Sequence, residues 1–161
     1  MSNSFYEDQS RLLTRPAFEF VFDAELKRAV RSQTFLTLFL LEAKREWDDL
    51  MVAADESTVA EVGRVVSHVV RDTDLVSKTG EGVLALVLLD ANFEDSAHVV
   101  DRLVTRIDSY GFVLPLHISI GAACFPTHAV DSDSLKRQAM SRPVANWRSG
   151  PSTFRTADSQ N

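Results

Sequence analysis

Three charged residues in the middle of the chain are of types that can bind a ligand. Arg71 and Asp74 are three residues apart, and Arg102 follows about 28 residues after Asp74. An arginine can donate two parallel hydrogen bonds and pair with phosphate, and a carboxylate accepts hydrogen bonds from N–H donors. Together they suit a ligand that offers both kinds of group. Alternatively, Arg71 and Asp74 form an ion pair that only closes a helix end.

A second stretch that bears on chemistry follows Asp74 after five residues: Gly80, Glu81 and Gly82, and then Val83 and Leu84. Glycines supply backbone angles that other residues avoid, and residues 74–77 and 83–89 on either side are rich in strand formers. The pattern predicts a β-hairpin whose turn spans residues 78–82.

Length and composition limit the number of domains, the classes of binding partner and the cellular compartment that we expect. The chain has 161 residues, 45% of them hydrophobic, which fits one compact domain. A net charge of -6 argues against binding to nucleic acid polymers or anionic membranes. We find no signal-like start and no apolar run of transmembrane length, and the single cysteine, Cys124, excludes an internal disulfide. We therefore expect a cytoplasmic protein.

The hydrophobic pattern predicts an α/β (α+β) fold in which helices pack on one largely antiparallel sheet. We expect a helix starting near Thr14 and Pro16, a buried strand at residues 34–41, and a helix capped by Asp55 or Ser57. The hairpin, a helix from Asn92 to Gly111, a strand near residues 114–120 and a helix from Ser132 to just before Pro143 complete the order. Residues 1–10 and 148–161 are polar and are expected to be flexible.

Four stretches resemble the GGDEF family of diguanylate cyclases in the same order and at similar distances. The hairpin stretch from Arg71 to Leu84 resembles the family's Arg-x-x-Asp motif and its signature, with the catalytic letters changed. The other three stretches are Leu13-Thr14 with Ala17-Phe18-Glu19, the helix around Arg102, and Ser119-Ile120-Gly121-Ala122-Ala123 followed by Pro126. Arg11 stands where the family usually has Asp. The resemblance implies that residues 11–147 form a degenerate GGDEF domain with a nucleotide-cyclase-like sheet.

The resemblance implies that the catalytic site is lost. In the family, two carboxylates hold the divalent ions that neutralise the triphosphate. Glu42 falls on the first of these positions, at the predicted end of the first strand, and Gly82 falls on the second. Glu81 brings negative charge to the place of a glycine that approaches phosphate, and Leu50 replaces the residue that reads guanine. We expect no enzyme activity, no metal or other cofactor, and only a vestigial role for Glu42.

The resemblance implies, in contrast, that a regulatory ligand site is kept. Arg71, Asp74 and Arg102 fall on positions that bind cyclic di-GMP in product-inhibited cyclases. Arginine can bond to guanine O6 and N7, and a carboxylate can accept from guanine N1 and N2. We therefore expect a cyclic di-GMP receptor that signals to an unidentified protein and that can form a homodimer when the ligand joins two copies.

Two other functions stay open at this point. The fold could be a scaffold that binds a protein partner without any ligand, or Glu42 could support residual Mg²⁺-dependent binding or hydrolysis of GTP. Trp47 could be a packed anchor or a partner contact. Other residues that can do chemistry have simpler explanations: Cys124 suits a core position, and the four histidines lack zinc-site spacing. These histidines are His68, His98, His117 and His128.

Overall fold

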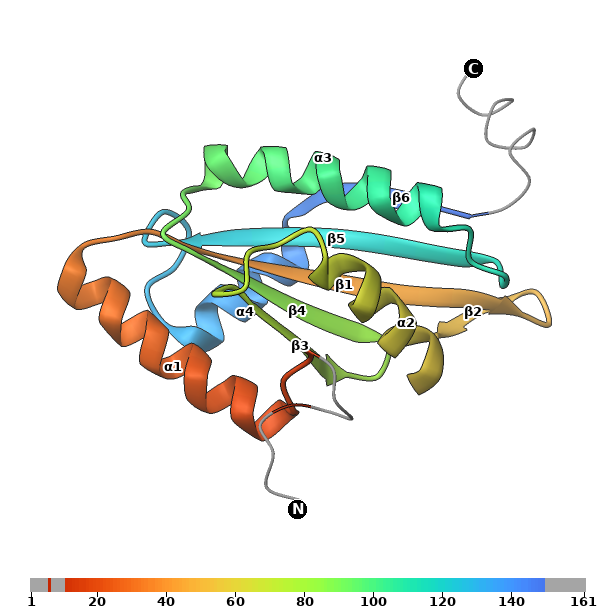
Figure 1. Ribbon diagram of the computed structural model, residues 1–161, viewed down its shortest axis with the longest axis horizontal. Coiled ribbons are helices and arrows are strands. Elements are labelled where there is room, and N and C mark those ends of the chain that lie inside the picture. The colour runs from red at the N-terminus through yellow and green to blue at the C-terminus, as the bar shows by residue number, and fades with distance from the viewer. Residues whose placement is uncertain (1–5, 7–10, 150–161) are drawn as a thin grey trace.

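The computed structural model describes Tyr6 and residues 11–149. The described residues form four helices and six strands. In chain order they are α1 (Arg15–Ser32), β1 (Leu36–Trp47), β2 (Leu50–Ala53), α2 (Glu56–Ser67), β3 (Leu75–Gly80), β4 (Val83–Leu89), α3 (Phe93–Tyr110), β5 (Leu116–Phe125), α4 (Ser132–Ser141) and β6 (Pro143–Arg148). Figure 1 shows how they are arranged. The predicted order of elements is confirmed, with β2 and β6 as two further strands.

The strands form one sheet with the order β3-β4-β1-β5-β6, and β2 pairs with the far half of β1. Every pairing between these strands is antiparallel. The predicted α+β fold class with a largely antiparallel sheet is confirmed. Among the described residues, the parallel contribution is one isolated bridge between Leu13 and Ser77.

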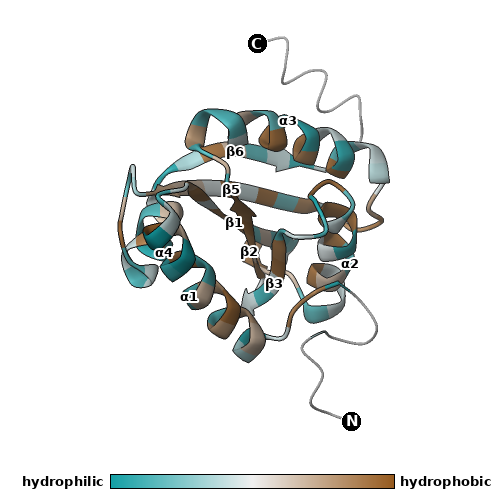
Figure 2. Cartoon of the chain, turned by 60° about the vertical axis from the view of Figure 1, so that its left-hand side comes forward, coloured by the Kyte–Doolittle hydropathy of each residue, from teal (hydrophilic) through white to brown (hydrophobic). Residues whose placement is uncertain are grey.

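Helices cover both faces of this sheet, and β1 shows how the sequence allows it. Phe39 and Leu41 join the apolar cluster under α2 and α3, whereas Leu38 and Leu40 join the cluster under α1 and α4. Successive strand residues point to opposite faces, so a strand covered on both sides needs a continuous apolar run. Figure 2 shows brown strands between helices along which teal and brown residues alternate, as in helices that bury one face. None of the described helices is long and apolar enough to span a membrane.

Each helix begins at a side chain that caps it. In every case a side-chain oxygen of the capping residue accepts a hydrogen bond from the backbone N–H three residues later. The caps are Thr14, Asp55, Asn92 and Asp131. Such a cap typically stabilises a helix by about 1 kcal/mol. The predicted helix starts at Thr14 and Asn92 are confirmed, and Asp55 rather than Ser57 caps α2.

The first strand is longer than predicted, and this changes the position of Glu42. β1 runs to Trp47, so Glu42 lies inside the strand, paired with Val83 and Ser119, and not at the strand end. The extension beyond Leu41 was not predicted because most of the residues that follow are charged. Apart from the buried Ala43, that half of β1 is held by hydrogen bonds to β5 and β2 rather than by burial of its side chains. A two-residue turn with positive φ at both positions then leads into β2.

The last strand was also missed. α4 ends at Ser141, as predicted from Pro143, but the next residues form the edge strand β6 along β5. Proline is tolerated on an edge strand because its missing N–H faces away from the ladder. Arg148, predicted to begin a flexible tail, belongs to β6, and the Ser149 N–H donates to the Leu116 carbonyl at 2.8 Å. The remaining residues of the predicted flexible ends, apart from Tyr6, lie outside the described residues.

Candidate ligand-binding site

The loop between α2 and β3 carries Arg71 and Asp74 and closes on itself. α2 ends at Ser67, so Arg71 lies in the loop and not at the helix end. The Asp74 N–H donates to the Arg71 carbonyl at 3.0 Å, and the Arg71 N–H donates to Asp74 Oδ2 at 3.0 Å. These two bonds fix the four-residue turn that the Arg-x-x-Asp spacing produces.

Asp74 also fastens this turn to the end of β4. Its other oxygen, Oδ1, accepts from the Leu89 N–H at 3.1 Å, and its side chain is only 3% exposed. The Arg71 guanidinium donates to the Leu89 carbonyl at 2.5 Å and lies 3.4 Å from Asp74 Oδ1. Both carboxylate oxygens are therefore engaged inside the protein, which opposes the predicted direct contact of Asp74 with a ligand. The Arg71 side chain remains 62% exposed.

Arg11 supports the same loop from the other side. Its guanidinium donates to three backbone carbonyls, those of Ser67, Arg71 and Asp74. A carbonyl left without a donor in a partly buried loop costs free energy, so one guanidinium with several N–H groups is well suited to this position. Sequence reasoning noted Arg11 only as a departure from the family pattern and missed this structural role.

Arg102 reaches the loop from α3, and its guanidinium donates to the Val69 carbonyl at 3.1 Å. Arg71, Asp74 and Arg102 line one cavity of about 270 Å³ between this loop, the end of β4 and the start of α3. The structure therefore brings together the three residues that the sequence singled out. The Arg71 guanidinium comes from the α2–β3 loop and the Arg102 guanidinium from α3. The β3–β4 hairpin separates these two elements along the chain.

Two acidic residues of this cavity were missed. Asp90 follows β4 with a φ of 60°, and Asp95 lies in the first turn of α3, near its positive dipole end. Asp90 is 3.9 Å from the Arg28 guanidinium, whereas the exposed Asp95 carboxylate has no ion-pair partner among the described residues. The signal was available, because a polar group that follows a strand and begins a helix often faces a cavity.

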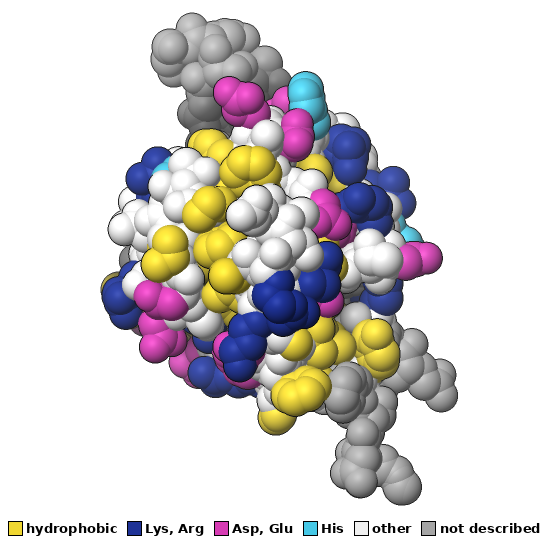
Figure 3. Space-filling view, turned by 90° about the vertical axis from the view of Figure 1, so that its left-hand side faces the viewer, with side chains coloured by type: hydrophobic (Ala, Val, Ile, Leu, Met, Phe, Trp, Pro, Cys, Tyr) yellow, Lys and Arg dark blue, Asp and Glu magenta, His cyan; other side chains and the backbone are white. Residues whose placement is uncertain are grey.

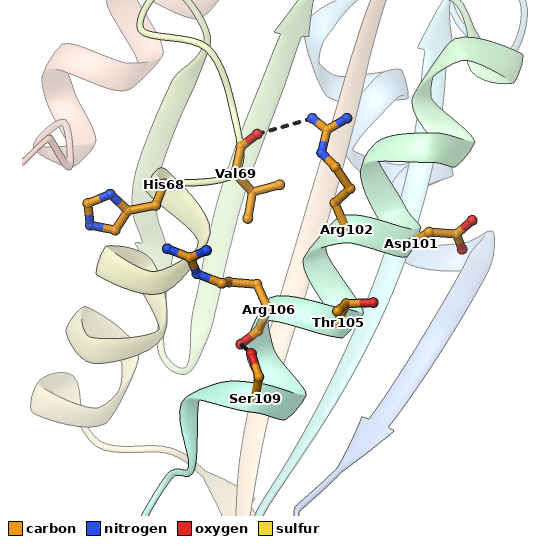
Figure 4. A pocket seen from close by; sticks show the side chains of 7 residues that line it. All are labelled: His68, Val69, Asp101, Arg102, Thr105, Arg106 and Ser109. Atoms are coloured by element: carbon orange, nitrogen blue, oxygen red, sulfur yellow. Dashed lines mark hydrogen bonds between the residues drawn. The ribbon is translucent and has the colours of Figure 1, made fainter.

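A second cavity, of about 400 Å³, shares Arg102 with the first. Its other lining residues come from the end of α2 and from α3, and they include His68, Thr105, Arg106 and Ser109. Figure 4 shows the Arg102 and Arg106 side chains extending toward the α2–β3 loop, while Asp101 points away from them. Sequence reasoning missed Arg106, although its place four residues after Arg102 puts both side chains on one face of a helix.

The tip of the hairpin has no room for a side chain at the position of Gly82. The hairpin is confirmed, but its turn is tighter than residues 78–82, with Glu81 and Gly82 between the two strands. Gly82 has a φ of +71°, and a Cβ there would lie 2.8 Å from the Ala43 carbonyl oxygen. The Gly82 carbonyl in turn accepts from the Ala43 N–H at 2.7 Å. The backbone of β1 thus packs directly against this glycine.

The cavity beside this turn, about 360 Å³, is lined mainly by acidic and small residues. Its charged members are Asp55, Glu56, Glu81 and Lys78, and the ammonium of Lys78 is 3.5 Å from Glu56. Hydrogen bonds from Thr58 lower the pKa of Asp55, which keeps that carboxylate charged. Glu42 does not line this cavity, because by strand alternation it faces the side of the sheet that carries α1 and α4.

The remaining reactive side chains have local partners. Cys124 is buried, and its backbone N–H donates to Nδ1 of His128 at 2.9 Å; burial lowers the pKa of that imidazole. Within the residues that the structure describes, no three His, Cys, Asp or Glu side chains are grouped closely enough to hold a metal ion. Trp47 is 60% exposed with the Arg45 guanidinium 5.1 Å from its ring centroid, so it is not a core anchor.

The surface carries charges of both signs. On the end face drawn in Figure 3, Lys and Arg side chains in dark blue lie among Asp and Glu side chains in magenta. Because the two cavities share Arg102, their arginines form a local cluster on a chain with a net charge of -6, which suits a small charged ligand.

Comparison with known proteins places the fold. No family model matches the chain, and no curated protein matches it. Among solved structures, a DGC protein from Thermotoga maritima aligns with a TM-score of 0.69 at 18% identity over 84% of this chain and 98% of that one. The FimX GGDEF domain from Pseudomonas aeruginosa aligns with a TM-score of 0.70 at 16% identity over 86% and 91%.

A third similar structure was solved with a ligand. The GGDEF domain of DgcB from Caulobacter crescentus, in complex with c-di-GMP, aligns with a TM-score of 0.65 at 15% identity over 88% of each chain. At these identities the likeness concerns the fold. This chain has the fold of a GGDEF domain, as the sequence resemblance predicts.

Proposed function

We propose that this chain, a domain with the GGDEF fold, is a receptor for cyclic di-GMP that has no cyclase activity. The observation that carries the proposal is the meeting of Arg71, Asp74 and Arg102 on one cavity. They come from separate parts of the sequence, and an ion pair that merely closed a loop would not need Arg102. The fold is also that of DgcB, whose GGDEF domain was solved with c-di-GMP.

The roles within this site follow from the contacts of each side chain. Arg71 is the ligand-facing donor, because most of its side chain is exposed and guanidinium can bond to guanine O6 and N7 in parallel. Asp74 is a positioning residue, because its oxygens hold the turn and the Leu89 N–H. We assign the acceptor for guanine N1 and N2 to Asp95, whose carboxylate is exposed at the cavity.

Two features of the hairpin support the absence of cyclase activity. Gly82 provides no carboxylate for a divalent ion, and the Ala43 carbonyl occupies the space that a side chain would need. Asp55, Glu56 and Glu81 surround the adjacent cavity with negative charge, which repels a triphosphate. Glu42, the vestigial candidate, is on the other face of the sheet.

The receptor would act through protein contacts. Cyclic di-GMP presents two guanines, so one ligand can join the arginines of two copies or of this chain and a signalling protein. Another similar structure, the diguanylate cyclase SiaD, was solved with its activator SiaC, so a protein of this fold can bind a protein partner. We expect ligand-dependent association of this chain, measurable by sedimentation.

Calorimetric titration of cyclic di-GMP tests the proposal. The wild type should bind saturably, Arg71→Ala should lose binding, and Arg137→Ala should bind like the wild type. Arg137 is a matched control because it is an exposed arginine on α4, on the opposite side of the sheet. No heat from a folded wild type would overturn the receptor. A parallel assay with GTP and Mg²⁺ should give no cyclic product.

One observation favours a second function, a scaffold that binds a protein without a ligand. Arg71 and Asp74 already bond to each other and to Leu89, so both could be purely structural. In that case Arg71→Ala would lower stability, and the wild type would bind no nucleotide.

A further inference from the structure

We propose that the cavity between His68, Arg102 and Arg106 is a phosphate subsite of the same ligand site. The inference rests on the proposed function, and it adds the group that binds the phosphodiester. The two cavities meet at Arg102, which lines both. The two cavities are therefore neighbours, and Arg106 lies on the other side of Arg102 from a base placed beside Arg71.

The charges of the two cavities differ, so one cavity suits the guanine base of the ligand and the other suits its phosphate. The cavity of Arg71 includes three carboxylates, those of Asp74, Asp90 and Asp95. Carboxylates repel a phosphate but accept hydrogen bonds from the N–H edge of a guanine. The same cavity also holds Arg71 and Arg102, so its formal charge is -1, from three carboxylates and two guanidinium groups, and it suits a base better than an anion.

The second cavity offers the opposite set of groups. Its donors are the guanidinium groups of Arg102 and Arg106, the imidazole of His68 and the hydroxyl of Thr105. Its one acidic residue, Asp101, points away from both guanidinium groups (Figure 4). The arrangement suits a phosphate, which accepts several charge-assisted hydrogen bonds at once.

Arg106 carries the argument, because nothing in the fold needs its charge. Among the described residues, its guanidinium makes no ion pair and no hydrogen bond, while its carbonyl accepts from the Ser109 hydroxyl. Arg102 and Arg106 are one helical turn apart on α3, where like charges repel each other. A bound anion would remove this repulsion. The cavity is also large enough for a phosphate with part of a ribose.

In the first test, inorganic phosphate is titrated into nitrogen-labelled protein, and its binding is measured from the shifts of the backbone amide NMR signals. Phosphate should shift the signals of His68, Thr105 and Ser109 saturably in the wild type and in Arg137→Ala. The shifts should disappear in Arg106→Ala, an exposed position whose loss leaves the core intact. Shifts that persist in Arg106→Ala, or that never appear in the wild type, would overturn the subsite.

The second test separates the subsite from the receptor itself. Cyclic di-GMP should bind Arg106→Ala about tenfold more weakly than the wild type, with a smaller loss of affinity on adding salt. If Arg71→Ala loses the dinucleotide but Arg106→Ala binds it with wild-type affinity and salt dependence, the subsite is wrong and the receptor stands. If phosphate shifts the three signals but the dinucleotide does not bind, the receptor is wrong and the anion site stands.

Discussion

The two ends of α2 face cavities of opposite chemistry. At the N-terminal end, Asp55 and Glu56 lie with Glu81 beside the hairpin turn, whereas at the C-terminal end His68 lies beside Arg102 and Arg106. Both arrangements agree with the helix dipole, which favours acids at the start and cations at the end. A helix start can bind a phosphate through its free amides, but here the Asp55 side chain already takes the Thr58 N–H. The acidic residues at the start of α2 thus repel anions from the hairpin cavity, whereas the cationic residues at its end can attract anions to the cavity of Arg102 and Arg106.

A carboxylate introduced at Gly82 should have the largest effect. We expect Gly82→Asp to lower the free energy of unfolding by about 3 kcal/mol, because of its positive φ and the clash with the Ala43 carbonyl. Urea unfolding measures this cost. Gly80→Asp is the matched control, since a Cβ there meets only Val83, at 3.8 Å. Equal stability of the two variants would show that a side chain at position 82 does not clash with the Ala43 carbonyl.

Asp74 and Asp95 line the same cavity, but substitution of each should affect a different property of the protein. Asp74→Asn replaces an acceptor oxygen by a donor beside two backbone N–H groups, so it should cost about 2 kcal/mol of stability and also weaken ligand binding. Asp95→Asn should leave stability within about 0.5 kcal/mol of the wild type but weaken cyclic di-GMP binding. Urea unfolding and calorimetry on both variants check the assignment. Wild-type affinity in Asp95→Asn would remove Asp95 from the site.

Arg11 should contribute less, and only to the order of the loop. Arg11→Ala removes the donors to the Ser67, Arg71 and Asp74 carbonyls, and we expect a loss of about 1 kcal/mol in stability. Amide exchange of the Arg71 and Asp74 N–H groups should become faster. Unchanged exchange at these two amides, with faster exchange elsewhere, would show that Arg11 does not support this loop.

The smallest effect is a pH dependence at the acidic end of α2. The pKa of Asp55 is lowered below its ordinary value of 3.8 by hydrogen bonds from Thr58. The stabilisation is therefore complete above about pH 3.8 and is lost as the pH falls through the folded-state pKa. Thermal melts in that range should show a loss in the wild type that is smaller in Asp55→Asn, whose amide oxygen can still cap the helix. The same slope in both proteins would assign the loss to other carboxylates.

Local patterns predicted the helices and the hairpin because the interactions that form them are close in sequence. Thr14 and Asn92 cap helices through bonds to residues three positions away, and the apolar run before Glu42 fills both faces of a central strand. β2, β6 and the second half of β1 were missed because most of their side chains are polar or at least partly exposed. Pairing with neighbouring strands, which local sequence does not encode, holds them in place.

The sequence by itself determined the fold class and the order of the main elements, and it singled out Arg71, Asp74 and Arg102, which line one cavity. Only the tertiary structure decided what each side chain faces. In the tertiary structure the Asp74 carboxylate points inward to Leu89, and Glu42 lies on the face of the sheet away from the hairpin cavity. Asp95 lies in one cavity with Arg71 and Arg102, and Arg106 lies in the second cavity with Arg102. The physical reason is that spacing along a chain fixes neighbours within one element. The contacts between elements depend on the hydrogen-bond register of the sheet and on how the helices pack against it.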